Sequence, residues 1–378
     1  MTRWLDKAIL CLVGLTFMGM MAYGARDQVF TGANDFLPLY NGTQLLGTPH
    51  LYSAEHNYAL IHEHAGGFNL SLRYTRPPYY AALLWPLGQL PYLYAYLLWS
   101  LIGFCALAAF ALLWRIPTPA DALVLTCFSL PAFQSLMNGQ DTPLLLLWIA
   151  LAVLFERKGR LFAAGFVLAL CASKFHLFTL LPLVFVGQRP WPMLKGFAAG
   201  AACLVALSFA VAGPNWPLEY YHTLADNRVH PDVFRMPNLH GLLSGLPAAG
   251  LLQVVAGAAV VVATWKVVQH SSFLYGLATT LIGSLLLSYH SYLSDCALLL
   301  PAATVVYAET RNPRLRLLGA LLLTPFLYFL LIAERPATYF AQLVIAAFFA
   351  GTVWHAFRHA RPQEAQPPPP LVRRAAAS

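Results

Sequence analysis

The feature that most restricts the fold of this chain is a series of apolar runs, many of them about twenty residues long. Wound as helices, such runs match the ~30 Å hydrocarbon thickness of a bilayer. The 378 residues are 59% hydrophobic and only 10% charged, whereas soluble domains carry about a quarter charged residues. A membrane β-barrel would show short segments of alternating polarity instead. The sequence therefore predicts an all-α polytopic membrane protein.

The apolar runs predict about 10–12 transmembrane helices. They are expected over about 8–24, 92–114, 120–136, 142–155, 161–187 (two short helices), 195–212, 246–268, 272–289, 293–308, 316–333 and 338–357. Large loops over about 25–90 and 213–241 interrupt the series, and short interfacial helices are expected in the first loop, over about 35–46 and 53–65. Residues 1–360 are predicted to form one membrane domain, followed by a disordered Pro-rich cytoplasmic tail over 361–378.

The basic residues indicate how the chain is oriented. Most of the 23 Lys and Arg residues fall in short segments on one side of the predicted helices, so the net charge of +8 reflects membrane topology and not nucleic-acid binding. Both termini are therefore predicted to be cytoplasmic, in a bacterial inner membrane. Most acidic residues then lie outside, which is where a functional site is expected.

The first outer loop carries Asp35 close to the membrane surface. One interpretation is an N-cap, because Asn34-Asp35 before Phe36 fits a helix start. The other is a general base, because the pKa of a carboxylate near apolar helices tends to rise. The residues alone leave both interpretations open.

Cationic residues in two segments are candidates for phosphate binding. Arg76 precedes the rigid Pro77-Pro78 pair, and its planar fork suits a phosphate. Lys174 interrupts an apolar stretch, and an ionisable residue in such a place is a functional candidate. Each also has a simpler explanation, a long side chain that reaches the membrane surface. Arg73 is better explained in that way.

Other polar residues of the outer segments are candidates for substrate contact. Gln140 follows an Asn-Gly pair that by itself predicts a tight turn, yet its amide suits a sugar hydroxyl. The second loop, with its aromatic and His residues, resembles a carbohydrate-contacting surface. The remaining candidates lie near loops or helix ends: Asn34, Tyr74, Asn238, His240, His290 and Asp295.

No nucleotide or metal motif is found. Walker A, GxGxxG, HExxH and nucleophile-elbow patterns are absent from the sequence. The six cysteines occur singly and without metal-ligand spacing. A lipid-borne donor and no metal or other cofactor are therefore expected.

The ordered series of motifs resembles glycosyltransferase family 87, integral membrane enzymes of the GT-C superfamily. The resemblance runs from Asp35 to about Pro301 and rests on these pieces, in order: Asn34-Asp35-Phe36, Tyr40, Gly47, Leu51-Tyr52, Tyr74, Pro77-Pro78, Pro86, Gly139-Gln140, Gly159-Arg160, Ala164-Gly165, Lys174, Asn238-Leu239-His240-Gly241, Ser288-Tyr289-His290, Asp295 and Pro301. Two positions depart from the family pattern: Phe175 stands where many members have Pro, and Asp141-Thr142 replaces the more usual x-Asn.

The resemblance implies a GT-C fold with an extracytoplasmic site and a polyprenyl-phosphate sugar as donor. It implies that Asp35 is the catalytic base and that His290 is a second site residue near the donor phosphate. The expected reaction is inverting transfer of a hexose, with mannose the first choice, to a lipid or glycan hydroxyl. The alternative from another class is a transporter or flippase for a lipid-linked or small polar solute, which would need midplane ionisable groups and inverted repeats.

Overall fold

The structure, a computed structural model, describes residues 2–65, 72–116, 118–188, 190–226 and 232–359. In these residues every regular element is helical, which confirms the all-α prediction. The elements are α1 (Thr2–Gly24), α2 (Arg26–Thr31), α3 (Phe36–Leu45), α4 (Ala54–Ala65), α5 (Pro78–Gly88), α6 (Tyr92–Leu113), α7 (Pro119–Phe128), α8 (Leu130–Met137), α9 (Thr142–Arg157), α10 (Leu161–Ala169), η1 (Leu170–Leu177), α11 (Leu181–Gln188), α12 (Trp191–Ala212), α13 (Trp216–Leu224), η3 (Val233–Arg235), α14 (Leu239–Leu243), α15 (Ala249–His270), α16 (Phe273–Leu287), η4 (Leu293–Leu298), α17 (Leu299–Glu309), α18 (Pro313–Leu322), α19 (Phe326–Ile332) and α20 (Ala337–His359). The predicted tail over 361–378 lies outside the described residues.

Several helices are long and apolar enough to cross a membrane, so the chain is a multi-pass membrane protein. By length and composition the described residues hold five such helices, α1, α6, α12, α15 and α20. The count rises to seven if the bent pairs α7–α8 and α18–α19 are each one span. The number is lower than the predicted 10–12, because apolar helices such as α9 and α16 have only 16 and 15 residues.

Proline explains where the two bent pairs break. Helices α7 and α8 meet at 63°, and Pro131 occupies the first turn of α8, where a missing N–H is tolerated. The Ser129 hydroxyl caps this new start by accepting from the Ala132 N–H at 3.4 Å. Pro325 stands at the break between α18 and α19, which meet at 59°. Each predicted single helix is therefore two helices.

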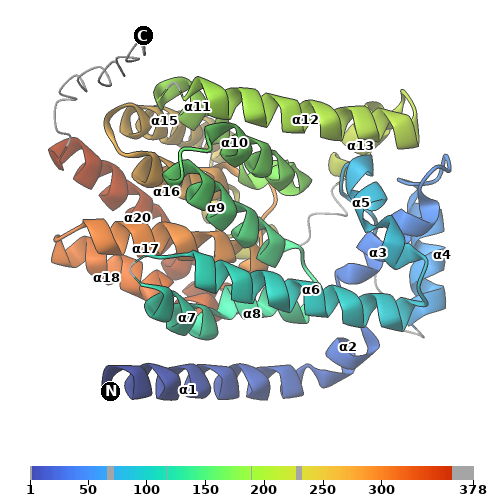
Figure 1. Ribbon diagram of the computed structural model, residues 1–378, viewed down its shortest axis with the longest axis horizontal. Coiled ribbons are helices and arrows are strands. Elements are labelled where there is room, and N and C mark those ends of the chain that lie inside the picture. The colour runs from blue at the N-terminus through green and yellow to red at the C-terminus, as the bar shows by residue number, and fades with distance from the viewer. Residues whose placement is uncertain (1, 66–71, 117, 189, 227–231, 360–378) are drawn as a thin grey trace, which may run out of the picture.

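The helices run roughly side by side, as Figure 1 shows, with α1 along one edge of the bundle. Helix α1 begins, and α20 ends, at the same end of the bundle. The short helices α3, α4 and α13 gather at the opposite end, together with α5. The interfacial helices predicted over about 35–46 and 53–65 correspond to α3 and α4.

Two hydrophobic clusters hold the bundle together. The larger joins the transmembrane helices and includes α16, whose residues from Tyr275 to Leu286 are all buried. The smaller is rich in aromatic residues and joins α3, α5 and α6. In it the Phe36 ring stacks on Trp99 with centroids 5.6 Å apart. Because Phe36 follows Asp35 directly, this packing fixes the position of the candidate carboxylate.

Candidate active site

The side-chain contacts at the start of α3 show which residue caps this helix. The Asn34 side-chain oxygen accepts from the Phe36 N–H at 3.0 Å, and its amide donates to the Met137 carbonyl at 3.1 Å. The Asp35 side chain makes no capping bond, and its backbone N–H donates to the Asn138 carbonyl at 3.0 Å. The carboxylate of Asp35 is half-buried and is not used to stabilise the helix end.

The turn that faces Asp35 needs a glycine. Gly139 has φ of +63°, and a Cβ there would lie 2.7 Å from Asn34 Oδ1 and 2.8 Å from Phe36 Cβ. The Trp99 indole N–H donates to the Gly139 carbonyl at 2.8 Å. This close approach brings the turn between α8 and α9 against Asp35.

Replacing Gly139 with alanine should therefore lower stability and activity together. The left-handed backbone costs an alanine about 1–2 kcal/mol, and the clash with Asn34 and Phe36 adds to that. Gly47→Ala is the matched control, since Gly47 has φ of +77° and no atom within 4 Å of the added Cβ. Thermal unfolding in detergent compares the two variants. Equal losses would show that the contact of Gly139 with Asn34 is unimportant.

Gln140 connects the candidate base to a buried lysine. Its Nε2 donates to Asp35 Oδ2 at 2.6 Å, and its Oε1 accepts from Lys174 Nζ at 2.7 Å. An ammonium group only donates and an ionised carboxylate only accepts. The two neighbours therefore fix which end of the amide faces Asp35.

Lys174 lies where the helical path between α10 and α11 breaks. Its φ and ψ of −123° and 54° are not helical, and its side chain is 3% exposed. Besides Gln140, Lys174 Nζ contacts Thr142 Oγ1 at 3.1 Å, Asp295 Oδ1 at 2.7 Å and Asp141 Oδ1 at 3.2 Å. The ammonium thus joins α9, η1 and η4.

Arg76 forms the second cationic contact of this network. Its Nε and Nη2 each lie 3.2 Å from an oxygen of Asp141, a two-pronged contact of the kind a guanidinium makes with a carboxylate. The Tyr52 hydroxyl donates to the Arg76 carbonyl at 2.9 Å and holds its backbone. Two cations and two carboxylates, those of Asp141 and Asp295, therefore balance one another.

Asp35 is the third carboxylate of this region and differs from the other two. Within the described residues no cation forms an ion pair with it. Burial raises the pKa of Asp35, although the Gln140 hydrogen bond and the charges of Lys174 and Arg76 oppose the rise. Burial acts on Asp141 and Asp295 in the same sense, but their cationic partners hold the pKa of both carboxyls below the ordinary value. The site thus holds two firmly ionised carboxylates beside one more basic one.

Two histidines lie beside this network. The ring centroids of His176 and His290 are 6.0 Å apart, and the His176 ring lies 5.3 Å from that of Tyr289. His290 was predicted as a site residue, whereas His176, Asp141 and Thr142 were not. The position of His176 two residues after Lys174 is the sequence signal for it, because a broken helix turns both side chains toward one region.

The structure gives each of three predicted substrate-contacting residues a partner outside the ionic network. Tyr74 is fully buried and donates to the Pro77 carbonyl at 2.8 Å. Asn238 donates to the Ser288 carbonyl at 2.7 Å and ties the second loop to the segment that carries His290. His240 lies 3.2 Å from the Gln253 side chain. Substrate contact by these three residues stays a prediction.

The structure thus places a buried ionic network among apolar helices, with one more basic carboxylate beside it. The model of glycosyltransferase family 87 matches residues 74–288, more than half of the chain. The chain therefore belongs to glycosyltransferase family 87 and is a membrane glycosyltransferase. No curated protein and no solved structure matches it. The matched region includes Arg76, Gln140 and Lys174, whereas Asp35, His290 and Asp295 lie beyond its ends.

Proposed function

We propose that this glycosyltransferase moves a hexose, with mannose the first candidate, from a polyprenyl-phosphate donor to a lipid or glycan hydroxyl. The proposed place is the extracytoplasmic face of a bacterial inner membrane, with both termini in the cytoplasm. The observation that carries the proposal is the state of Asp35, a half-buried carboxylate with neither a capping bond nor an ion pair within the described residues. Such a group is available to take a proton.

The reaction proceeds as a single displacement with inversion. Asp35 removes the proton from the acceptor hydroxyl as its oxygen bonds to the anomeric carbon. The bond from that carbon to the phosphate oxygen breaks, and the polyprenyl phosphate leaves with the electron pair. A phosphate leaves as an anion without needing a proton, so one carboxylate base suffices. Independence of metal ions remains a prediction.

The cationic network supports two roles for Lys174 and Arg76. Contact with the donor phosphate, with His290 as a helper, is the role expected from the residue types. In the structure, however, Asp141 and Asp295 already balance both charges. A phosphate oxygen would have to displace one of these carboxylates. We therefore also assign Lys174 a positioning role, which is to hold the Gln140 amide toward Asp35.

Gln140→Leu tests this positioning through the pH dependence of transfer. The hydrogen bond from Gln140 lowers the pKa of Asp35, so its loss raises that pKa further. Because the base acts when deprotonated, the fall in activity on acidification should begin at higher pH. Hydrogen bonds to a charged group favour the charged form, so the acidic limb of the rate profile should move to higher pH in the variant.

The matched control for this prediction is Thr142→Val. That variant removes a different partner of the Lys174 ammonium and leaves the contact between Gln140 and Asp35 in place. Its pH profile should follow that of the wild type. A Gln140→Leu profile that also coincides with the wild type would contradict the positioning role.

The donor and the stereochemistry are tested by product analysis. The purified protein is supplied with β-linked polyprenyl-phosphate mannose or with the glucose analogue, and crude membrane lipids serve as acceptor. The proposal predicts an α-linked product by NMR and a preference for mannose. A β-linked product would contradict single displacement, and preference for glucose would correct the sugar. Solute flux in proteoliposomes without transfer would favour the transporter alternative.

A further inference from the structure

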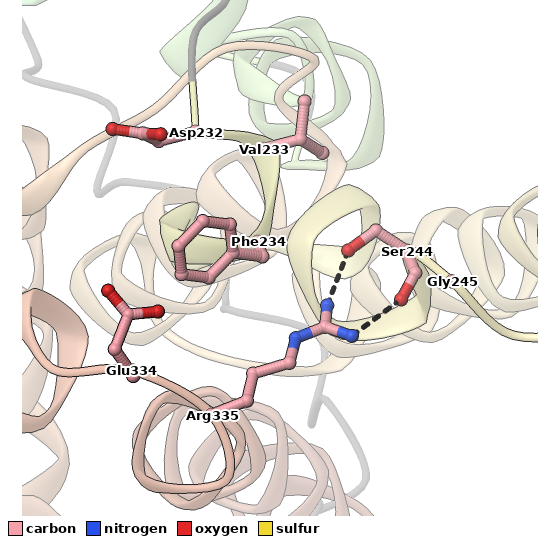
Figure 2. A pocket seen from close by; sticks show the side chains of 7 residues that line it. All are labelled: Asp232, Val233, Phe234, Ser244, Gly245, Glu334 and Arg335. Carbon is pink, nitrogen blue, oxygen red and sulfur yellow. Dashed lines mark hydrogen bonds between the residues drawn. The ribbon is translucent and has the colours of Figure 1, made fainter.

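A pocket outside the ionic network lies between the second loop and the start of α20. Its volume is about 690 Å³, within the roughly 300–1,000 Å³ typical of ligand sites. Figure 2 shows the Phe234 side chain between the carboxylates of Asp232 and Glu334, with Arg335 reaching toward Ser244. The lining residues are Asp232, Val233, Phe234, Ser244, Gly245, Glu334 and Arg335.

The walls of this pocket are held by specific bonds. Arg335 donates to the Ser244 carbonyl at 3.0 Å and to the Ser244 hydroxyl at 2.6 Å. The Gln342 amide donates to the carbonyls of Phe234 and Met236, both at 2.8 Å. These bonds tie η3 and the end of α14 to α20. The pocket is therefore preformed, which lowers the entropic cost of binding a ligand.

The charges around the pocket favour a neutral ligand. Arg235 lies 2.8 Å from a Glu334 oxygen and 3.6 Å from an Asp232 oxygen. With Arg335, the group comprises two guanidiniums and two carboxylates, so its formal charge is zero. A phosphate would meet two carboxylates, and a cation would meet two guanidiniums.

A polyol matches this lining better than either ion. The Glu334 and Asp232 side chains are 76% and 55% exposed, so their oxygens can accept bonds from ligand hydroxyls. The partly exposed Phe234 ring offers an apolar surface for the C–H groups of a sugar ring. A carbohydrate or cyclitol presents both kinds of group at once.

The pocket is connected to the ionic network through the 288–295 segment. Asn238, four residues after Phe234, donates to Ser288 O at 2.7 Å and to Ser291 Oγ at 3.0 Å. The same segment leads to Asp295, which binds Lys174. Burial first, and then the charges of Asp232, Asp295 and Asp35, raise the pKa of the Tyr292 phenol. Asp232 in the pocket and the candidate base Asp35 thus both act on one side chain.

We infer that this pocket binds the polyhydroxylated head of the acceptor and that the 288–295 segment links it to the ionic network. The inference rests on the proposed function, because it names the acceptor site of that same reaction. The donor carries an anionic phosphate, which gains no net attraction from a group whose formal charge is zero. The pocket therefore separates acceptor recognition from the region proposed to hold the donor.

Equilibrium binding tests the pocket without requiring transfer. The full-length protein in nanodiscs is titrated with two probes, a short-chain alkyl mannoside and methyl mannoside, and bound ligand is followed by saturation-transfer NMR. Both should bind, and the double variant Asp232→Asn/Glu334→Gln should bind each at least tenfold more weakly, since hydrogen bonds to charged groups are lost. Tighter binding of the alkyl probe indicates a lipid-borne acceptor, and equal binding indicates a soluble glycan.

The variants are chosen so that folding does not decide the result. The Arg235–Glu334 pair is exposed, and such pairs contribute only about 0–1 kcal/mol. Glu55→Gln, an exposed acid on α4, is the matched control and should bind like the wild type. Unchanged binding in the double variant, or no binding by the wild type, would overturn the acceptor site. Pocket-dependent binding without any transfer from polyprenyl-phosphate mannose would instead count against the proposed function.

Discussion

Asp35→Asn is expected to reduce glycosyl transfer by about 10²–10⁴-fold, the usual contribution of a positioned general base. Asparagine keeps the shape of the side chain but cannot accept the hydroxyl proton. Folding should be preserved, because Asn34 caps α3 and no described cation depends on Asp35 for an ion pair. Initial rates with saturating donor measure the loss, and thermal unfolding measures the fold.

Asp27→Asn provides the control for this prediction. Asp27 lies only eight residues before Asp35, in the first turn of the neighbouring α2, and is exposed. Its replacement removes one carboxylate from the same loop without affecting the network, so transfer should stay near the wild-type rate. An Asp35→Asn enzyme that transfers as fast as Asp27→Asn would eliminate Asp35 as the base.

Lys174→Met is expected to have the largest effect on stability. The side chain is 3% exposed, and its removal leaves Asp295 buried with no cationic partner among the described residues. Removing one partner of a buried ion pair typically costs about 3–5 kcal/mol. Asp141 keeps Arg76 and is less affected. The variant should therefore unfold at a clearly lower temperature in detergent, followed by intrinsic tryptophan fluorescence.

Two further variants separate the loss of stability in Lys174→Met from a loss of phosphate binding. Asp295→Asn combined with Lys174→Met should recover part of the stability, because the unpaired charge is removed. Lys7→Met breaks the partly exposed Lys7–Asp121 pair and should cost no more than about 1 kcal/mol. A Lys174→Met protein of wild-type stability that fails to bind the donor would show that Lys174 serves the phosphate alone.

Local sequence signals predicted much of the fold. The helices expected over about 35–46, 53–65 and 92–114 correspond within one or two residues to α3, α4 and α6. Their ends are set by residues nearby in the sequence, such as Asn34 at the start of α3 and Pro91 before α6. The number of full spans was predicted less well, because hydropathy does not distinguish a transmembrane helix from a short one enclosed by others, such as α16.

The pairing of the site residues could not be read from the sequence. The motifs named Asp35, Gln140 and Lys174 separately, yet the first two lie 105 positions apart and meet at 2.6 Å. Arg76 and Asp141 are 65 positions apart. Periodicity and turn signals act over a few residues, whereas these contacts depend on how α3, α5 and α9 pack. Whether Asp35 or Asn34 caps α3 was likewise decided only by the side-chain geometry.

The ion pairs of Lys174 and Arg76 change how these two cations are interpreted. A lysine in an apolar run suggested a phosphate ligand, but in the structure four oxygen-bearing side chains already surround its ammonium. A buried charge is stable only when it is paired and hydrogen-bonded, so part of the role of Lys174 is to hold the site together. The proposed contact of Lys174 with the donor phosphate requires a phosphate oxygen to displace one of these partners.

The most direct test of Asp35 as the base uses donor loaded in advance. Wild-type and Asp35→Asn proteins are incubated with radiolabelled polyprenyl-phosphate mannose, freed of excess donor, and then mixed with membrane-lipid acceptor for one turnover. The predicted result is glycosylated lipid and polyprenyl phosphate in equal amounts from the wild type, with donor bound but uncleaved in the variant. Product formation at equal rates in both proteins would contradict the assignment of Asp35 as the catalytic base.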